Sequence, residues 1–385
     1  MSKTKLNTQI NTAALSEKIK QWGSELGFQQ VGISDIDLSE YEPKMLDWLK
    51  KGFHGEMSYM ASHGTKRSRP AELLPGTISL VSVRLDYLPP DAAFAATLEQ
   101  PNQAFISRYA LGRDYHKVIR NKLKKLGQMI EKELNLDDLA FRPFVDSAPV
   151  LERPIAEKAG LGWIGKHTLT INKEAGSWFF LGELFLPIAL ETDTPAENEC
   201  GTCVACITTC PTKAIVEPYV VDGRKCISYL TIELKDSIPE QYRKAMGNRI
   251  YGCDDCQLIC PWNRYAELST EPDFLPRSQL HPVSLLELWQ WQEPHFLKVT
   301  EGSPIRRIGF ECWMRNIAVA LGNAPFSLEV VEQLTNKLTL ISDMVDEHIH
   351  WALEQQKQKA ENEGVGSRQL KRLIKAIRIG LPRDA

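Results

Sequence analysis

The feature that most constrains this chain is a run of four closely spaced cysteines. The stretch CGTCVACITTCP holds Cys200, Cys203, Cys206 and Cys210, with a proline directly after the last one. This is the spacing of bacterial ferredoxins, in which three thiolates wrap one face of a four-iron cluster and the fourth ligates a neighbouring cluster. The run therefore predicts a second cluster and further cysteines along the chain.

A second, shorter run supplies those cysteines. The stretch YGCDDCQLICPW holds Cys253, Cys256 and Cys260, but a full repeat would also need a cysteine where Ile250 stands. Cys226 is the only other cysteine between the two runs, so we expect it to fill that vacancy. The predicted ligands are Cys200, Cys203, Cys206 and Cys260 for the first cluster, and Cys210, Cys226, Cys253 and Cys256 for the second.

Zinc sites or core cysteines placed by chance fit this pattern less well. Structural zinc usually pairs two Cys-x2-Cys knuckles, and three consecutive spacings of this kind leave no natural division into tetrahedral sites. The ninth cysteine, Cys312, lies in a helical segment and is expected to be a small buried hydrophobe. The cysteines therefore predict two [4Fe-4S] clusters and electron transfer, without indicating the acceptor.

Composition and charge describe an ordinary globular chain. Hydrophobic residues make up 43%, charged residues 25%, and the net charge is −3, so any surface for nucleic acid must be local. The polar N-terminal sequence lacks the apolar core of a signal peptide. The most apolar stretch, 177–190, is interrupted by Glu183 and Pro187 and is too short for a membrane span. These features predict a cytoplasmic protein without membrane contact.

Three regions follow one another along the chain. Helices and strands alternate over about the first 190 residues, which predicts an α/β domain. The cysteine-rich region follows. After about residue 280 the pattern is helical, and similar segments at 318–322 and 351–353 predict a helical-pair solenoid. The expected helices are 14–27, 42–52 and 112–135, and the expected β segments are 31–36, 74–90, 141–147 and 177–186.

The last helical segment, 367–380, is amphipathic and strongly basic. It fits two interpretations equally well: a solvated cap on the helical repeats, or a face that binds phosphates. The candidate phosphate-binding residues in this region and in the preceding repeat are Arg306, Arg307, Arg315, Lys371 and Arg372.

The stretch 144–172 carries the densest chemistry outside the cysteines. Asp146 follows an expected strand, and the Gly-rich turn 160–165 would let backbone approach a large ligand closely. From the residues alone, Asp146 is equally well a ligand-facing acid or a helix N-cap. Nearby, Asp114 and His116 form an incomplete B12-binding Asp-x-His-x-x-Gly pattern with Ile119 in place of glycine, so we do not expect His116 to ligate cobalt.

Four long motifs resemble the epoxyqueuosine reductase family along essentially the whole chain. They are VDSAPVLER with GLGWIGKHT, CGTCxxCxxxCPTxAI, GNRxYGCDxCQxxCPWN and RRIGFxxWxRNxAxALGN. The resemblance implies an α/β cobalamin-binding domain over 1–194, related to reductive dehalogenases. It also implies a ferredoxin-like domain with two [4Fe-4S] clusters over 195–265 and HEAT-like, tRNA-binding helical repeats over 266–385.

The same resemblance implies an activity. The family reduces epoxyqueuosine to queuosine at the wobble position of tRNA, the last step of queuosine biosynthesis, using base-off cobalamin without a histidine ligand. Asp146 would be the proton donor, which calls for a raised pKa. The implied cofactor-binding residues are Arg69, Tyr109, Asp146, Thr170, Ser228 and Thr231.

Some alternatives remain open. Arg69 and Tyr109 are equally consistent with surface ion pairing and core packing. The implied partners are tRNA and an unidentified low-potential electron donor, and a monomer is expected. The competing functions are a cobalamin-dependent reductase of another substrate, such as an organohalide, and a non-enzymatic iron–sulfur electron carrier.

Overall fold

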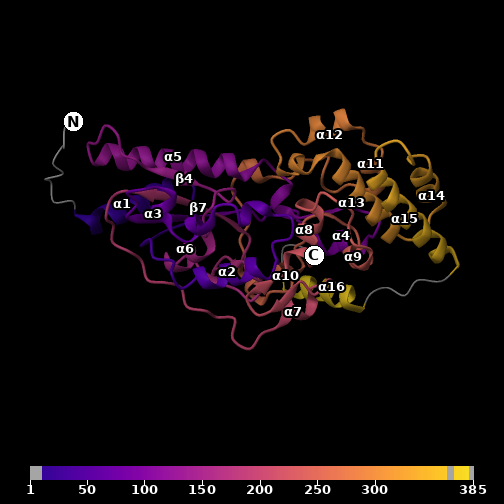
Figure 1. The fold of residues 1–385 in the computed structure, drawn as a ribbon, viewed down its shortest axis with the longest axis horizontal. Coiled ribbons are helices and arrows are strands. Elements are labelled where there is room, and N and C mark those ends of the chain that lie inside the picture. Colours follow the sequence, from indigo (N-terminus) through magenta and orange to yellow (C-terminus); the bar gives the residue numbers. More distant parts are fainter. Residues whose placement is uncertain (1–10, 362–367, 381–385) are drawn as a thin grey trace.

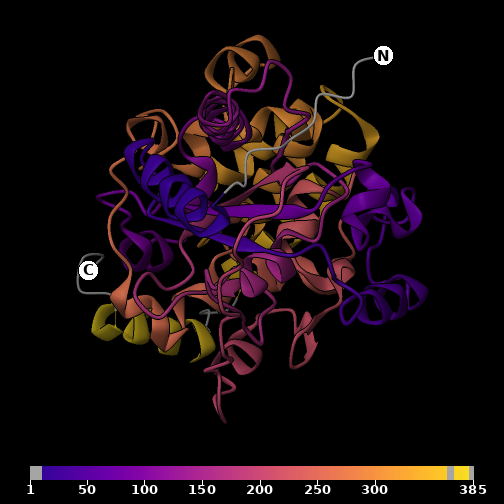
Figure 2. The same cartoon turned by 90° about the vertical axis from the view of Figure 1, so that its left-hand side faces the viewer.

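The computed structural model describes residues 11–361 and 368–380. A half with a β-sheet near the N-terminus joins a helical half near the C-terminus, and the cysteine-rich segments lie between them (Figure 1). Figure 2 turns the N-terminal half toward the reader. The first ten residues of the polar N-terminal sequence lie outside the described residues. Within those ranges, no helix combines the length and apolar character that a membrane crossing requires.

An antiparallel four-stranded sheet forms the centre of the N-terminal half, in the order β1-β2-β7-β4. Helices and strands alternate along the chain as predicted. Every pairing in this sheet is nevertheless antiparallel, although such alternation is more typical of parallel sheets. The strands are β1 (Gln30–Ser34), β2 (Ser79–Asp86), β4 (Arg142–Phe144) and β7 (Phe179–Leu186).

Helices cover both faces of this sheet. On one face, Val81 and Val83 of β2 share a core with α1 and α5, whereas Leu80 packs with α6 on the other. Because successive strand residues point to opposite faces, all of β2 is buried. The helices are α1 (Thr12–Glu25), α5 (Tyr115–Glu133) and α6 (Glu152–Lys158).

Short elements connect this half to the rest of the molecule. The strand β3 pairs in parallel with β10 of the cysteine-rich region, so the two regions share a small sheet. The elements are α2 (Glu42–Lys50), η1 (Ser58–Met60), η2 (Gly64–Arg67), α3 (Pro70–Leu73), α4 (Phe94–Glu99), β3 (Phe105–Ile106), η3 (Arg108–Ala110), β5 (Trp163–Ile164) and β6 (Thr170–Ile171).

The cysteine-rich region consists of short helices and strands. The helices α7 and α10, one in each cysteine run, pack against each other. The elements are α7 (Ala205–Thr209), β8 (Ile215–Glu217), β9 (Val220–Val221), η4 (Gly223–Lys225), α8 (Ile227–Ile232), α9 (Glu240–Met246), β10 (Arg249–Tyr251), α10 (Asp255–Leu258), η5 (Pro261–Tyr265) and η6 (Pro272–Phe274).

The C-terminal half is helical, as predicted. The two similar segments lie on α13 and α15, which pack together so closely that a Cβ on Gly322 would stand 2.6 Å from the Trp351 ring. The elements are α11 (Leu285–Trp289), α12 (Glu293–Val299), η7 (Pro304–Ile308), α13 (Gly309–Asn323), α14 (Leu328–Thr335), α15 (Asp343–Glu361) and α16 (Arg368–Gly380).

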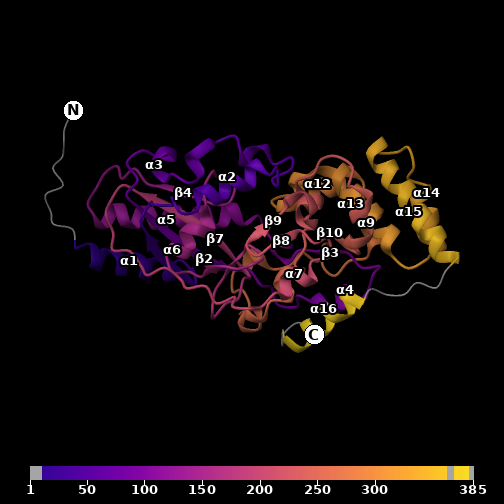
Figure 3. The ribbon, with the colours of Figure 1, turned by 60° about the horizontal axis from the view of Figure 1, so that its bottom comes forward.

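The last helix corrects one expectation. We expected α16 to continue the helical repeats, but it packs against α4, α10 and η5. Its buried residues Leu373, Ile374 and Ile377 belong to the same core as α1 and α5. Figure 3 shows α16 apart from α14 and α15, beside α4 and below α7. The segment 362–367 before it lies outside the described residues.

Candidate functional site

The first set of thiolates surrounds one cavity. Cys200, Cys203 and Cys206 from the first run and Cys260 from the second line this space together. The second-run cysteine thus joins the first three, as the ferredoxin spacing predicts. Trp262, two residues after Cys260, closes part of the wall.

The Gly-rich stretch contributes to this cavity as well. Lys166 and His167 line it. Lys166 Nζ donates to the carbonyl oxygens of Gly201, at 2.6 Å, and Cys203, at 2.9 Å. These bonds tie the first cysteine loop to the N-terminal half. Burial, followed by the charge of Arg153, lowers the pKa of His167 to about 4, so this imidazole is neutral near pH 7.

The second set of thiolates lies deeper. Burial raises the pKa of Cys256, and the nearby thiolates of Cys226 and Cys210 raise it further. Burial likewise raises the pKa of Cys253, and the negative charge of Cys256 contributes to this rise. The four predicted ligands of the second cluster are therefore neighbours, and Cys226 stands with them.

Hydrogen bonds and an ion pair hold this second set. The Ala214 amide donates to Cys210 Sγ at 3.2 Å. Such bonds stabilise sulfur ligands in their thiolate form. Arg249 Nε lies 2.7 Å from Asp255 Oδ1 in a buried ion pair that fixes the loop carrying Cys253.

Asp146 lies at the centre of a second group of polar side chains. Tyr115 Oη donates to Asp146 Oδ2 at 2.5 Å, and the Asp146 amide donates to Glu152 Oε1 at 2.6 Å. Its φ of 45° is unusual for a residue with a side chain and indicates local strain. The N-cap alternative is wrong, because α6 begins only at Glu152.

His116 connects Asp146 to two further charges. Its Nε2 lies 3.3 Å from Asp146 Oδ2, as an ion pair without the alignment of a hydrogen bond. Its Nδ1 lies 2.7 Å from Asp114 Oδ1. Arg307 donates to the other oxygen of Asp114 at 2.9 Å. Asp114 also caps α5 by accepting from the His116 amide, so the helix start fixes the imidazole. We call Asp114, Tyr115, His116, Asp146 and Arg307 the Asp146 network.

The charges in this network oppose a simple acid role for Asp146. Burial acts to raise the pKa of Asp146, but interactions with His116 and Tyr115 outweigh it and hold the pKa below its usual value. Burial acts to lower the pKa of His116, but Asp114 and Asp146 raise it overall. The expected raised pKa of Asp146 is therefore wrong in this structure, and these interactions shift the pKa of Asp146 down and that of His116 up.

Glu152 carries the strongly raised pKa instead. Burial, followed by the negative charge of Asp146, raises the pKa of Glu152 to about 8. Glu183 on β7, buried and bonded to Ser82 at 2.8 Å, also has a raised pKa from burial and the charge of Glu152. The Asp146 side chain is 58% exposed, so solvent reaches its carboxylate, and we call this open side of Asp146 the recess.

Aromatic rings connect the recess to the second thiolate set. Tyr109 lies 6.2 Å from the Tyr115 ring and 6.2 Å from the Tyr251 ring, measured between centroids. Tyr251 ends β10 two residues before Cys253. Tyr109 and Cys253 pack against the same core. Neighbouring rings therefore lead from the strand that precedes Cys253 to Tyr115, which bonds Asp146.

Three other residues were predicted to bind the cofactor, and the hydroxyls of Thr170 and Ser228 differ from that of Thr231 in their partners. Thr170 is buried on β6, and its hydroxyl has no partner. Ser228 bonds the Cys226 thiol. The Thr231 hydroxyl, in contrast, is used within the protein, since it donates to the Ile227 carbonyl and accepts from the Gly252 amide.

Arg69 points to surface carboxylates, whereas Arg67 is buried near Asp146. Arg69 is half exposed and pairs with Glu42 at 2.8 Å and Glu72 at 3.0 Å. The Nε of Arg67 has no hydrogen-bond partner. Burial lowers the pKa of Arg67, and the negative charges of Asp146 and Glu152 act against this lowering. Sequence reasoning missed Arg67, Glu152 and the joint action of Tyr115, His116 and Arg307. Only the incomplete Asp-x-His pattern pointed toward any of them.

The five candidate phosphate-binding residues do not form one surface. Arg315 is fully buried and donates to the carbonyls of Leu230, Leu234 and Asp236. It holds α8 to α13, so its predicted place on an RNA-facing surface is wrong. Arg307 belongs to the Asp146 network, and Arg306 is exposed beside it on η7. The remaining two, Lys371 and Arg372, are exposed on α16.

Comparisons with known proteins agree along the chain. The family described as "Epoxyqueuosine reductase QueG, DUF1730" matches residues 67–147, and "4Fe-4S double cluster binding domain" matches residues 199–263. The second match assigns an iron–sulfur double-cluster domain to the cysteine-rich region. Two curated relatives and two solved structures extend the likeness over most of the chain.

The curated relatives are the epoxyqueuosine reductases of Escherichia coli (strain K12) and Vibrio cholerae. The first is 62% identical over 383 residues, covering 99% of this chain and 100% of the relative. The second is 59% identical over 371 residues, covering 96% of this chain and 99% of the relative.

The solved structures share the fold. A selenomethionine-labelled epoxyqueuosine reductase superposes with a TM-score of 0.82 at 26% identity, covering 95% of this chain and 99% of that one. An epoxyqueuosine reductase with a tRNA-Tyr epoxyqueuosine-modified stem loop has a TM-score of 0.81 at 25% identity and the same coverage. With its cysteine spacing, its fold and relatives of this identity over nearly its full length, the chain belongs to the epoxyqueuosine reductase family.

Proposed function

We propose that this protein is an oxidoreductase that reduces epoxyqueuosine in tRNA to queuosine. The observation that carries the proposal is the side-chain path from the second thiolate set through Tyr251, Tyr109 and Tyr115 to Asp146. It places a proton-transfer group next to an electron route. Family membership and the relative bound to a modified tRNA stem loop support the same activity.

The reaction requires both kinds of carrier. Converting an epoxide to an alkene consumes two electrons and two protons and releases the oxygen as water. The two [4Fe-4S] clusters would bring single electrons from outside, the first through Cys200, Cys203, Cys206 and Cys260. The second set, Cys210, Cys226, Cys253 and Cys256, lies nearest the recess and would deliver them.

Protons would reach the opening epoxide through Asp146. Its Oδ2 lies 3.3 Å from the His116 imidazole, whose pKa is raised above the ordinary value. As negative charge develops on the epoxide oxygen, a proton would pass from the His116 imidazolium to the Asp146 carboxylate and from there to that oxygen, leaving His116 neutral and Asp146 ionised. Tyr115 orients the carboxylate, and Asp114 with Arg307 fixes the imidazole.

Cobalamin is part of the proposal, and this chain's residues fit it at two positions. The unpartnered Thr170 hydroxyl and the exposed Asp146 carboxylate offer polar atoms to a large ligand, Ser228 bonds the Cys226 thiol, and Tyr109 lies between Tyr251 and Tyr115. Arg69 and Thr231 have their polar atoms engaged elsewhere, and Arg67 replaces Arg69 as a candidate. When bound, base-off cobalamin would supply a strongly reducing cobalt centre.

Three regions would divide the work. We assign cofactor and substrate binding to 1–194, the clusters to 195–265, and tRNA binding to helical repeats of HEAT-like type in 266–385. Arg306 and Arg307, exposed or half exposed on η7 next to the Asp146 network, are the proposed tRNA phosphate contacts. A cytoplasmic monomer supplied by a low-potential electron donor completes the proposal.

A single-turnover assay tests the activity. The protein is purified anaerobically, loaded with iron, sulfide and cobalamin, and checked by absorption and EPR spectra. It is then mixed with dithionite and an anticodon stem loop carrying epoxyqueuosine. Mass spectrometry should show loss of one oxygen atom from the modified nucleoside. An unchanged nucleoside with fully loaded, reduced protein contradicts the proposal, and loaded protein without added reductant is the control.

A further inference from the structure

The position of α16 against the cluster loops has a consequence for electron entry. Gln369 on this helix donates to the Thr209 carbonyl at 2.7 Å, at the end of α7 between Cys206 and Cys210. The apolar side of α16 packs with Leu258 and Ile259, between Cys256 and Cys260. The helix thus contacts both cysteine runs, and it lies beside the first thiolate set.

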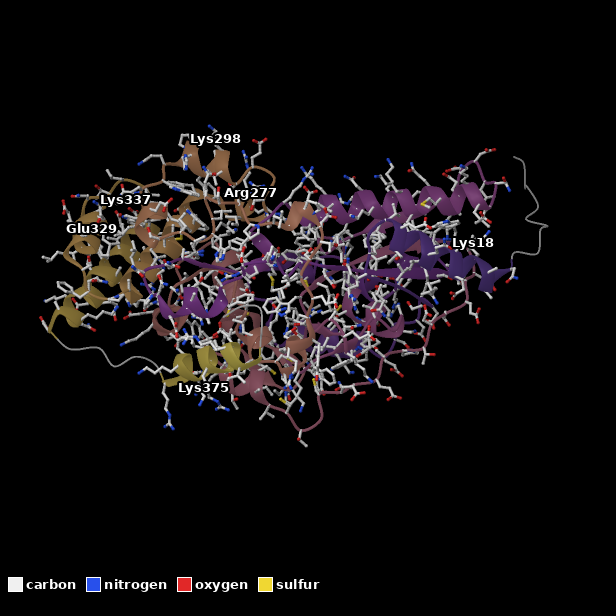
Figure 4. All side chains as sticks on the ribbon, turned by 180° about the vertical axis from the view of Figure 1, so that it is seen from behind. Lys18, Arg277, Lys298, Glu329, Lys337 and Lys375 are labelled. Atoms are coloured by element: carbon white, nitrogen blue, oxygen red, sulfur yellow. The ribbon has the colours of Figure 1, made fainter. Side chains whose placement is uncertain are left out.

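The outer side of α16 is a concentrated cationic surface on a chain with a net charge of −3. Within the part of the chain that the structure describes, no carboxylate pairs with its exposed cations apart from Glu99, which pairs with Arg378. Figure 4 labels one of them, Lys375, on α16. We call these residues the basic face: Arg368, Lys371, Arg372 and Lys375.

The first thiolate set reaches the surface, unlike the second. Cys203 is exposed, and Val204 next to it is 48% exposed. Tyr265, at the end of η5 beneath α16, is 51% exposed. Electron transfer between proteins requires the donor centre to approach the acceptor closely, so the surface around Cys203 is the natural entry point.

A groove adjoins the basic face. It has a volume of about 600 Å³ and lies between α4 and α16, with Leu98 and Ile374 in its wall and Lys371 and Lys375 along it. Ile379 at its end is 74% exposed. Apolar residues bordered by unpaired cations fit a partner that presents carboxylates around an apolar contact.

We propose that the basic face of α16 docks a small acidic protein that carries single electrons at low potential, of the ferredoxin or flavodoxin class, beside the first cluster. This rests on the proposed electron route through the clusters. Each encounter would oxidise the carrier by one electron and reduce the first cluster by one, with no bond made or broken. Two encounters would supply one epoxide reduction.

The observations favour a protein carrier over RNA on this face. A nucleotide entering the recess must approach Asp146, which is held by the start of α5 and by η7. In Figure 1, α16 lies along the lower edge beside α7 and α5 along the upper edge. An encounter steered by charge is also the usual way in which weak electron-transfer complexes form quickly.

Stopped-flow reduction tests the docking. Flavodoxin hydroquinone is mixed anaerobically with the loaded enzyme, and cluster bleaching is followed as ionic strength is varied. Lys371→Glu/Arg372→Glu should slow the second-order reduction by about tenfold at low ionic strength and weaken its salt dependence. The control is Lys124→Glu/Lys125→Glu, the same charge change on exposed positions of α5, which should leave the rate unchanged.

Two further measurements separate the possible outcomes. Dithionite, which needs no docking surface, should reduce the clusters of every variant at the wild-type rate. Slower reduction by dithionite would show that electron transfer through the clusters themselves is impaired, and it would count against the proposed function. Binding of the modified stem loop should be unaffected by the α16 substitutions. An unchanged flavodoxin rate, or weakened RNA binding by the α16 variant alone, overturns the proposal and assigns the basic face to RNA in the latter case.

Discussion

The thiolate sets and the Asp146 network are assembled in opposite ways. The first thiolate set takes three of its four ligands from one short run of sequence and the second takes two, and the two runs exchange one cysteine each. The Asp146 network draws residues from 114–116, 146 and 307, almost 200 positions apart. Electrons are therefore handled by local motifs, whereas proton handling depends on how distant segments pack.

The largest effect is expected at the thiolates. Cys256→Ala removes a ligand of the second set and should abolish epoxide reduction, with iron falling from about eight per chain. Cys312→Ala, which removes the buried cysteine on α13, should retain full iron and activity. Iron and sulfide analysis with EPR checks both variants. Equal iron loss in the two would contradict the ligand assignment.

A large effect with intact clusters is expected at Asp146. Asp146→Asn keeps the size of the side chain but removes the proton-transferring carboxylate. The single-turnover rate should fall by about 10² to 10⁴ because general acid catalysis contributes that much. Iron content, cobalamin binding and dithionite reduction should match the wild type. Wild-type turnover in this variant would remove Asp146 from the mechanism.

A pH-dependent effect is expected at His116. Burial acts to lower its pKa, but Asp114 and Asp146 raise the pKa above the ordinary value, so the imidazolium persists to higher pH than in a free histidine and is lost as pH rises through that raised pKa. The wild-type single-turnover rate should therefore decline on the alkaline side. In His116→Gln the rate should be about tenfold lower near pH 7 and lack this decline. An identical alkaline decline in the variant would assign the titration to another group.

The smallest effect is expected at Glu152. Its folded-state pKa of about 8 lies above the ordinary value, so its contribution to stability is full below the ordinary pKa and is lost as pH rises through about 8. Glu152→Gln keeps an oxygen for the Asp146 amide but does not titrate. The melting temperature of the variant, measured relative to that of the wild type, should rise by a few degrees between about pH 5 and pH 9. Parallel curves would show that Glu152 keeps its ordinary pKa.

The sequence predicted the sheet half less completely than the cysteine region. Its helices and strands were placed close to their observed bounds, because their apolar residues recur at helical or strand spacing. The antiparallel pairing, the position of α16 and the burial of Arg315 were not predicted. Each depends on which element packs beside which, and periodicity within one segment carries no information about that.

Cysteine spacing alone was enough to predict two clusters and the exchange of Cys210 and Cys260 between them, because ligands a few residues apart are held together by the chain itself. The long motifs were enough to indicate the family and to single out Asp146. Folding decided the rest. It raised the pKa of His116, buried Arg67 rather than Arg69 near Asp146, and set a basic helix against the cluster loops. Charges act through space, so a group's protonation depends on neighbours that lie far away in sequence.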